Sequence, residues 1–119
     1  MRHAIRIFYL GRRYHGFQLQ KDLDTVEKRI QEALQAADYL EEGKSFLYAS
    51  RTDKGVDAFQ QVIALDTEKR LIFPKINMNL PEDIIAWAST PVDPDFSPRF
   101  HAISRSYLYI CRHDGEDLD

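Results

Sequence analysis

Apolar residues recur along this chain with two periods, and these periods predict most of its secondary structure. Short runs rich in aliphatic and aromatic residues predict strands at 3–10, 46–50, 60–66, 84–90 and 103–112. One amphipathic helix is predicted over 25–39, where Val26, Ile30, Ala33, Leu34 and Ala37 recur at helical spacing. The segment between Pro74 and Pro81 has room for a helical turn or two. This mixture predicts an α+β fold with a mostly antiparallel sheet and helices on one face.

Local signals add detail to these elements. Asp24, followed three residues later by Glu27, predicts a capping box at the start of the helix. Trp87 and most phenylalanines are expected in the core. Three prolines, Pro91, Pro94 and Pro98, predict an irregular connection that cannot lie in a central strand.

The last predicted strand, 103–112, has two different faces. Ser104, Ser106, Leu108 and Ile110 alternate with Arg105, Tyr107 and Tyr109. Because side chains alternate across a strand, the second set forms an aromatic and basic stripe. Such a stripe suits the stacking of an RNA base, and it equally suits a half-buried sheet face.

Composition narrows the class of protein. The chain has 119 residues, the size of one domain, and no apolar run of the roughly 18 residues that span a bilayer. Its single cysteine, Cys111, cannot form an internal disulfide. Its N-terminus has no apolar secretion signal, so a cytoplasmic protein is expected. The histidines show no metal-ligand spacing, and the scattered glycines form no phosphate-binding loop, which argues against metal or nucleotide cofactors.

Charge is unevenly distributed along the chain. The net charge is −3, but the first 21 residues carry five basic groups and no acid. Four acids lie in the last six residues, and without them the net charge would be +1. Local patches rather than the total charge set the field that a polyanion meets, so RNA binding is permitted.

Residues 51–57 are the strongest candidate for a catalytic segment in the sequence. Arg51, Thr52 and Asp53 place a base, a hydroxyl and an acid side by side, followed by a glycine that can turn the chain. An arginine beside a carboxylate can keep it ionised and oriented, as a nucleophile or base requires. The same residues are also common in plain turns, and spacing alone favours that simpler interpretation.

Five ordered motifs across nearly the whole chain resemble the TruA family of tRNA pseudouridine synthases. They are Tyr14-His15-Gly16-Phe17-Gln18-Leu19-Gln20; Val26-Glu27 with Ile30-Gln31 and Ala33-Leu34; Ser50-Arg51-Thr52-Asp53-Lys54-Gly55-Val56 followed by Gln61-Val62; Asn77 and Asn79-Leu80-Pro81 with Asp83-Ile84; and Phe96, Arg99-Phe100, Ala102, Arg105 and Tyr107-Leu108-Tyr109. In the third motif the family's aspartate is catalytic, which assigns that role to Asp53.

The resemblance implies an isomerase that converts uridine to pseudouridine in the anticodon stem-loop of tRNA, without cofactor or metal. The expected fold is the ferredoxin-like or RRM-like half of the pseudouridine synthase fold. The resemblance further implies a homodimer. The expected substrate-binding residues are Arg51, Thr52, Tyr107, Arg105, Tyr14, Gln18, Gln20, Arg99, Arg12, Arg13 and Lys54, with Lys21 as a further phosphate contact.

The chain departs from the family pattern at three points. Ser50 replaces a frequent glycine, and Asp57 replaces the usual histidine after Val56. The chain also stops after the strand 103–112, so residues 1–119 are expected to be a single domain, the N-terminal half, without the C-terminal half that completes the cleft. This domain is expected to fold alone, to pair through its last strand and not to catalyse alone. Two alternatives follow: a non-catalytic tRNA- or RNA-binding domain, and a plain α+β interaction domain.

Overall fold

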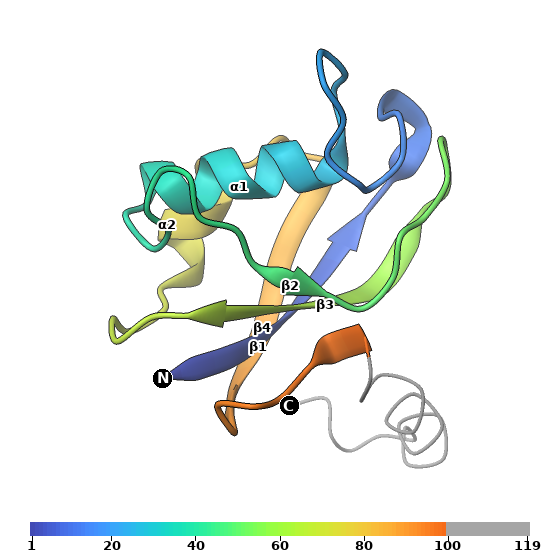
Figure 1. Cartoon of the computed structure of the whole chain (residues 1–119). Coiled ribbons are helices and arrows are strands. Elements are labelled where there is room, and N and C mark those ends of the chain that lie inside the picture. Colours follow the sequence, from blue (N-terminus) through green and yellow to red (C-terminus); the bar gives the residue numbers. More distant parts are fainter. Residues whose placement is uncertain (100–119) are drawn as a thin grey trace.

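The computed structural model describes residues 1–99, which form a four-stranded sheet with two helices (Figure 1). The elements in chain order are β1 (Arg2–Tyr9), the 3₁₀ turn η1 (Gly11–Arg13), α1 (Val26–Ala36), β2 (Leu47–Tyr48), β3 (Ala58–Asp66), α2 (Phe73–Asn77) and β4 (Ile84–Val92). The strand order is β2-β3-β1-β4, and every pairing is antiparallel. This β-α-β-β-α-β arrangement is the ferredoxin-like topology, so the predicted α+β class is confirmed.

The core lies between one face of the sheet and the two helices. Along β1, Ile5, Ile7 and Tyr9 are buried while the residues between them are more exposed. Ile30 and Leu34 of α1 join the same buried cluster. Burying each such side chain contributes about 1.5–3 kcal/mol, so the alternation of β1 and the periodicity of α1 determine which faces meet. Both helices lie on the same side of the sheet, as predicted (Figure 1).

The start of α1 corrects the predicted capping box by one residue. The cap is Thr25, whose backbone is extended and whose hydroxyl accepts a hydrogen bond from the Lys28 N–H at 3.3 Å. Asp24 instead accepts two hydrogen bonds from the Arg29 guanidinium. Arg29 lies one turn into the helix, and this charged donor outcompetes the backbone amides for the Asp24 carboxylate.

The end of α1 and the bounds of the strands also differ from the predictions. The helix ends at Ala36 because Asp38 takes a positive φ of 68° and turns the chain so that Tyr39 enters the core. The strand predicted over 46–50 shortens to β2, and the strand predicted over 60–66 begins earlier, at Ala58. Pro91 lies inside β4, opposite His3, rather than in an irregular connection. A proline is tolerated there because β4 is an edge strand among residues 1–99.

Two aromatic side chains expected in the core lie elsewhere. Trp87 is 37% exposed and Phe59 is 68% exposed, whereas Phe17 and Phe46 are buried as predicted. Both exposed rings occur where the strand register shifts, between Arg6 and Ile7 for β4 and between Ile7 and Tyr9 for β3. The bulge in β3 turns Phe59 away from the face of the buried Gln61, Ile63 and Leu65, whereas Trp87 alternates regularly with the buried Ile84 and Ala86 and so faces outward. The predicted strand 103–112 lies outside the described residues.

Candidate functional site

Residues 50–57 connect β2 to β3 at the end of the sheet where β1 also ends (Figure 1). Asp53 is exposed in this 50–57 loop. It borders a hollow of about 520 Å³, here called the loop hollow. The lining residues are His15, Gln18, Gln20, Leu23, Arg51, Thr52, Asp53 and Lys54. The structure therefore brings two segments that the sequence singled out, 14–20 and 50–56, to one place.

The entrance to the loop is held by a buried amide. Gln61 of β3 is 3% exposed, and its Nε2 donates to the Ser50 carbonyl at 2.8 Å. Its Oε1 accepts from the Ser50 N–H at 3.3 Å. One side chain thus satisfies both backbone groups of the residue where the chain leaves the sheet. An unpaired buried polar group costs about 1–3 kcal/mol, so these bonds keep Ser50 in place.

The middle of the loop is held by a buried hydroxyl. The Tyr9 hydroxyl shares a 2.6 Å hydrogen bond with Thr52 Oγ1, directly before Asp53. The Thr52 carbonyl accepts from the Phe17 N–H at 3.1 Å. Tyr9 is fully buried, and its burial raises the pKa of the phenol, so the hydroxyl stays protonated at neutral pH. Thr52 is therefore attached to β1 through its side chain and to the 14–20 segment through its backbone.

The exit of the loop is held by a carboxylate and a close backbone contact. The Asp53 carbonyl accepts from the Val56 N–H at 3.1 Å, and Gly55 at φ 81° completes this turn. Asp57 Oδ1 then accepts from the Gly11 N–H at 2.7 Å. A Cβ atom on Gly11 would lie only 2.0 Å from the Val56 carbonyl oxygen. Asp57, which replaces the family's usual histidine, thus serves here as a backbone anchor.

Among residues 1–99, Asp53 itself is held only through its backbone. Within residues 1–99 its carboxylate makes no side-chain hydrogen bond and no ion pair. The expected pairing with Arg51 is not formed, because Arg51 Nη1 donates to Gln18 Oε1 at 3.2 Å. Gln20 Nε2 donates to the His15 carbonyl at 2.8 Å, on the same side of the hollow. The arrangement presents a carboxylate to solvent from a loop held at both ends.

Four other predicted site residues, Arg12, Arg13, Tyr14 and Arg99, do not line the loop hollow. Tyr14 is buried, and its hydroxyl donates to Asp83 Oδ1 at 2.6 Å. Burial and this bond raise the pKa of Tyr14 to about 12. Arg13 Nε donates to Asp83 Oδ2 at 2.8 Å. Arg12 and Arg99 are exposed, and Arg105 and Tyr107 lie outside the described residues. Tyr14 is therefore placed to support the 14–20 segment.

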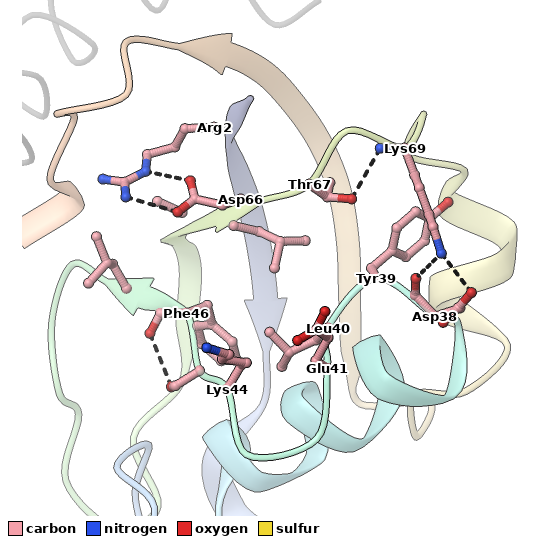
Figure 2. A pocket seen from close by; sticks show the side chains of 14 residues that line it. Arg2, Asp38, Tyr39, Leu40, Glu41, Lys44, Phe46, Asp66, Thr67 and Lys69 are labelled. Carbon is pink, nitrogen blue, oxygen red and sulfur yellow. Dashed lines mark hydrogen bonds and ion pairs between the residues drawn. The ribbon is translucent and has the colours of Figure 1, made fainter.

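A second hollow of about 550 Å³ lies beside the edge formed by β2, here called the edge hollow (Figure 2). Arg2 donates to both carboxylate oxygens of Asp66, and Lys69 Nζ donates to Asp38 Oδ2 at 2.6 Å. Within residues 1–99, no group of three or more histidine, cysteine or acidic side chains could hold a metal ion. No helix among these residues has the length and apolar character to cross a membrane.

Sequence reasoning assigned no role to Tyr9 or Gln61. The role of Gln61 could have been predicted from the sequence, because it is a polar residue on the same face of β3 as the inward-facing Ile63 and Leu65. A polar residue at a core position is a candidate for a structural hydrogen bond. The role of Tyr9 could not have been predicted in this way, since an aromatic residue at the end of a strand is typical of a core. Its hydrogen-bond partner, Thr52, is 43 residues away in the sequence.

Curated relatives of the chain include archaeal proteins that share one name. No family model matches the chain. It is 43% identical to tRNA pseudouridine synthase A of Methanosarcina mazei, over 99% of this chain and 45% of that protein. The proteins of the same name from Methanosarcina acetivorans and Archaeoglobus fulgidus are 45% and 43% identical, over 100% of this chain and 45% and 43% of their own lengths. The chain spans a little less than half the length of these relatives.

Proposed function

This chain belongs to the tRNA pseudouridine synthase A family, and on that premise we propose that it supplies the catalytic carboxylate for converting uridine to pseudouridine in tRNA. The carboxylate is that of Asp53. The observation that carries the proposal is the contrast between the backbone and side chain of this residue. The backbone around it is held by Gln61, Tyr9 and Asp57, while the carboxylate has no partner among residues 1–99.

The reaction suits a carboxylate presented in this way. The N1–C1′ glycosidic bond breaks, the freed uracil turns, and a C5–C1′ bond forms. C5 loses its proton and N1 gains one, so substrate and product are isomers and no redox partner is needed. Asp53 acts on the uridine as nucleophile or base, and it can do so only from a fixed position, because misplacement of a reacting group sharply lowers the rate.

The loop hollow suits a single flipped-out base. Its volume of about 520 Å³ lies within the ~300–1,000 Å³ typical of small-molecule sites. The amides of Gln18 and Gln20 line it beside Asp53 and could hydrogen-bond the polar edge of uracil. Extruding a base from its stack costs a few kcal/mol, which contacts within a pocket can offset.

The proposed RNA partner is the anticodon stem-loop of tRNA. Arg12, Lys54 and Arg99 are exposed, as contacts to phosphates require. Exposed Lys21 and Arg13, which also pairs with Asp83, extend this basic set along the 11–21 segment. The family resemblance supports four further parts of the proposal. Arg105 contacts a phosphate and Tyr107 stacks on a base. The protein is a homodimer, and it is located in the cytoplasm.

A chimera provides a direct test. This chain would replace the matching 45% of the Methanosarcina mazei relative, so that the remaining part of that protein completes the fold. We expect the chimera to form pseudouridine in a tRNA transcript, measured by mass spectrometry after a single turnover. Asp53→Asn keeps the side-chain size, removes the carboxylate and should lower this rate by several orders of magnitude while tRNA binding persists.

The matched control is Asp66→Asn, which changes an equivalent carboxylate in the edge hollow and should leave the rate unchanged. Near-normal pseudouridine formation by Asp53→Asn would refute the assignment of Asp53. A folded chimera that binds tRNA but forms no pseudouridine would instead favour the alternative of a non-catalytic RNA-binding domain.

A further inference from the structure

The sheet face opposite the helices carries a group of aromatic and apolar side chains beside the 50–57 loop. This aromatic platform consists of Arg6, Phe8, Phe59, Ile85 and Trp87. Phe59 of β3 and Ile85 and Trp87 of β4 are 68%, 41% and 37% exposed, which is unusual for large apolar residues on the two strands that flank β1. We propose that the platform binds unpaired RNA bases by stacking, as a second contact surface next to the loop hollow. This inference rests on the proposed function for its RNA substrate.

A strand irregularity in β3 adds Phe59 to the platform. Ile7 pairs with Gln61 and Tyr9 with Ala58, so two residues of β3, Phe59 and Gln60, lie opposite Phe8. The Phe8 and Phe59 ring centroids are 5.6 Å apart. Such bulges are frequent next to active sites, where they re-aim side chains.

On the other side of β1, Arg6 pairs with Ala88 and Ile7 with Ala86, which leaves Trp87 as the extra residue. The Arg6 guanidinium carbon lies 5.6 Å from the Trp87 ring centroid. Trp87 alternates with the buried Ile84 and Ala86, so its indole lies beside Arg6 on the face that carries Phe8 and Phe59. Aromatic and guanidinium planes are the two surfaces on which unpaired bases stack in RNA-binding proteins.

The charge of these strands favours RNA over an acidic or neutral protein partner. The strands β1, β3 and β4 contain a single acidic residue, Asp66. Asp66 is paired with Arg2 at the far end of the sheet. The platform end therefore carries the positive charge of Arg6 and no carboxylate from its own strands. The acids that directly precede β3 and β4 at this end, Asp57 and Asp83, are bonded to Gly11 and to Arg13 and Tyr14, so the charge on the strands beside the rings is that of a cation, which suits a polyanion.

The topology provides an independent reason. The order β2-β3-β1-β4 places β1 and β3 at the centre of the sheet, and these strands carry Phe8 and Phe59. RNA-recognition domains likewise stack two or three bases on aromatic residues of a four-stranded sheet. Phe8 directly precedes Tyr9, which holds Thr52, and Phe59 follows the 50–57 loop by two residues. The platform and the 50–57 loop therefore lie at the same end of the sheet.

Trp87 is the only tryptophan of the chain, so its fluorescence reports directly on the platform. The 119-residue chain would be titrated with a short oligouridylate and with an abasic oligomer that has the same number of phosphates. We expect the oligouridylate to quench Trp87 and to bind more tightly, because only it offers bases for stacking. Phe59→Leu, which keeps an apolar side chain, should weaken oligouridylate binding about tenfold and leave the abasic oligomer unaffected.

Two controls separate this inference from the proposed function. Met78→Ala removes a side chain that is 77% exposed at the end of α2, away from the platform, and should change nothing. Asp53→Asn should leave the quenching intact, because stacking needs no catalysis. If the chimera forms no pseudouridine while oligouridylate still quenches Trp87, the proposed function fails and the platform stands.

Three results would overturn the platform. The first is an affinity for oligouridylate that Phe59→Leu does not change. The second is a Trp87 emission that RNA leaves unaltered while the chimera remains active. The third is protection of Trp87 from a small neutral quencher in the RNA-free chimera, which would show that the rest of the protein covers this face.

Discussion

The two hollows of this molecule have nearly the same volume, but they differ in whether their aspartates are paired with a basic side chain. In the edge hollow, Arg2 pairs with Asp66 and Lys69 with Asp38 (Figure 2). In the loop hollow, Asp53 has no side-chain partner among residues 1–99, and Arg51 binds only the neutral amide of Gln18 within them. Volume alone therefore gives no reason to prefer one hollow over the other as the functional site. The proposal that the loop hollow is the reactive site rests on an aspartate that has no side-chain partner among residues 1–99 and whose backbone is held by buried side chains.

The two hollows also differ in what holds their walls. The charged pairs of the edge hollow are side-chain contacts with at least one exposed partner, such as Asp66 at 64% and Asp38 at 82%. The 50–57 loop is instead held by the buried side chains of Tyr9 and Gln61 and by the contact with Gly11. Buried polar bonds are costly to leave unmade, whereas exposed ion pairs contribute little. Mutations should therefore have graded effects at the two places.

The largest effect on stability is expected for Gly11→Ala. Its Cβ would lie 2.0 Å from the Val56 carbonyl oxygen, a backbone atom that cannot rotate away. The loop must shift, at a cost of about 3 kcal/mol or more. Gly43→Ala is the matched control, because Gly43 has a φ of 85° but no neighbour within 4 Å, so only the conformational cost of about 1–2 kcal/mol applies. Urea denaturation of the 119-residue variants measures both, and equal losses would show that the loop is not packed against Gly11.

An intermediate effect is expected for Tyr9→Phe. The substitution keeps the buried ring and removes only the hydroxyl that bonds Thr52. Stability should fall by about 0.5–1.5 kcal/mol. In the chimera kcat should fall while the KM for tRNA stays constant, because the hydroxyl positions Asp53 and contacts no RNA. A parallel rise in KM with constant kcat would contradict this positioning role. Phe8→Leu is a matched change one residue away, and it should affect RNA affinity rather than kcat.

The smallest effect is expected for Asp66→Asn in the edge hollow. The hydrogen bond from Arg2 lowers the pKa of Asp66, so its carboxylate stabilises the folded state above the ordinary aspartate pKa of about 3.9. This contribution is lost as the pH falls through the lower pKa of the folded state. Because Asp66 is well exposed, the loss at neutral pH should be only about 0.2–1 kcal/mol. Thermal unfolding at pH 7 and pH 2 measures it, and a difference that persists at pH 2 would exclude the ion pair as its cause.

The sequence predicted some residues of the candidate site correctly as neighbours and others not. The 50–56 motif and the glutamines of the 14–20 segment lie together in the loop hollow, where the family resemblance placed them. Tyr14 belongs to the same motif but is buried against Asp83, because a motif records which residues recur and not which way each side chain points. The pairing of Arg51 with Gln18 instead of Asp53 has the same origin, since neighbours in sequence compete with partners brought in by the fold.

The sequence by itself determined the α+β class, the position of α1 and the family, and it singled out Asp53 as the proposed catalytic residue. These depend on periodicity and on short ordered motifs, which are local properties of a chain. Tertiary structure alone decided that Tyr9, Gln61 and Gly11 hold the loop, that Asp57 anchors it, and that Trp87 and Phe59 face outward. The Tyr9 and Gly11 contacts join residues more than 40 positions apart, and the outward orientation of Phe59 follows from a bulge in β3 that shifts the register by one. A one-residue shift exchanges the two faces of a strand, and no local pattern records where it occurs.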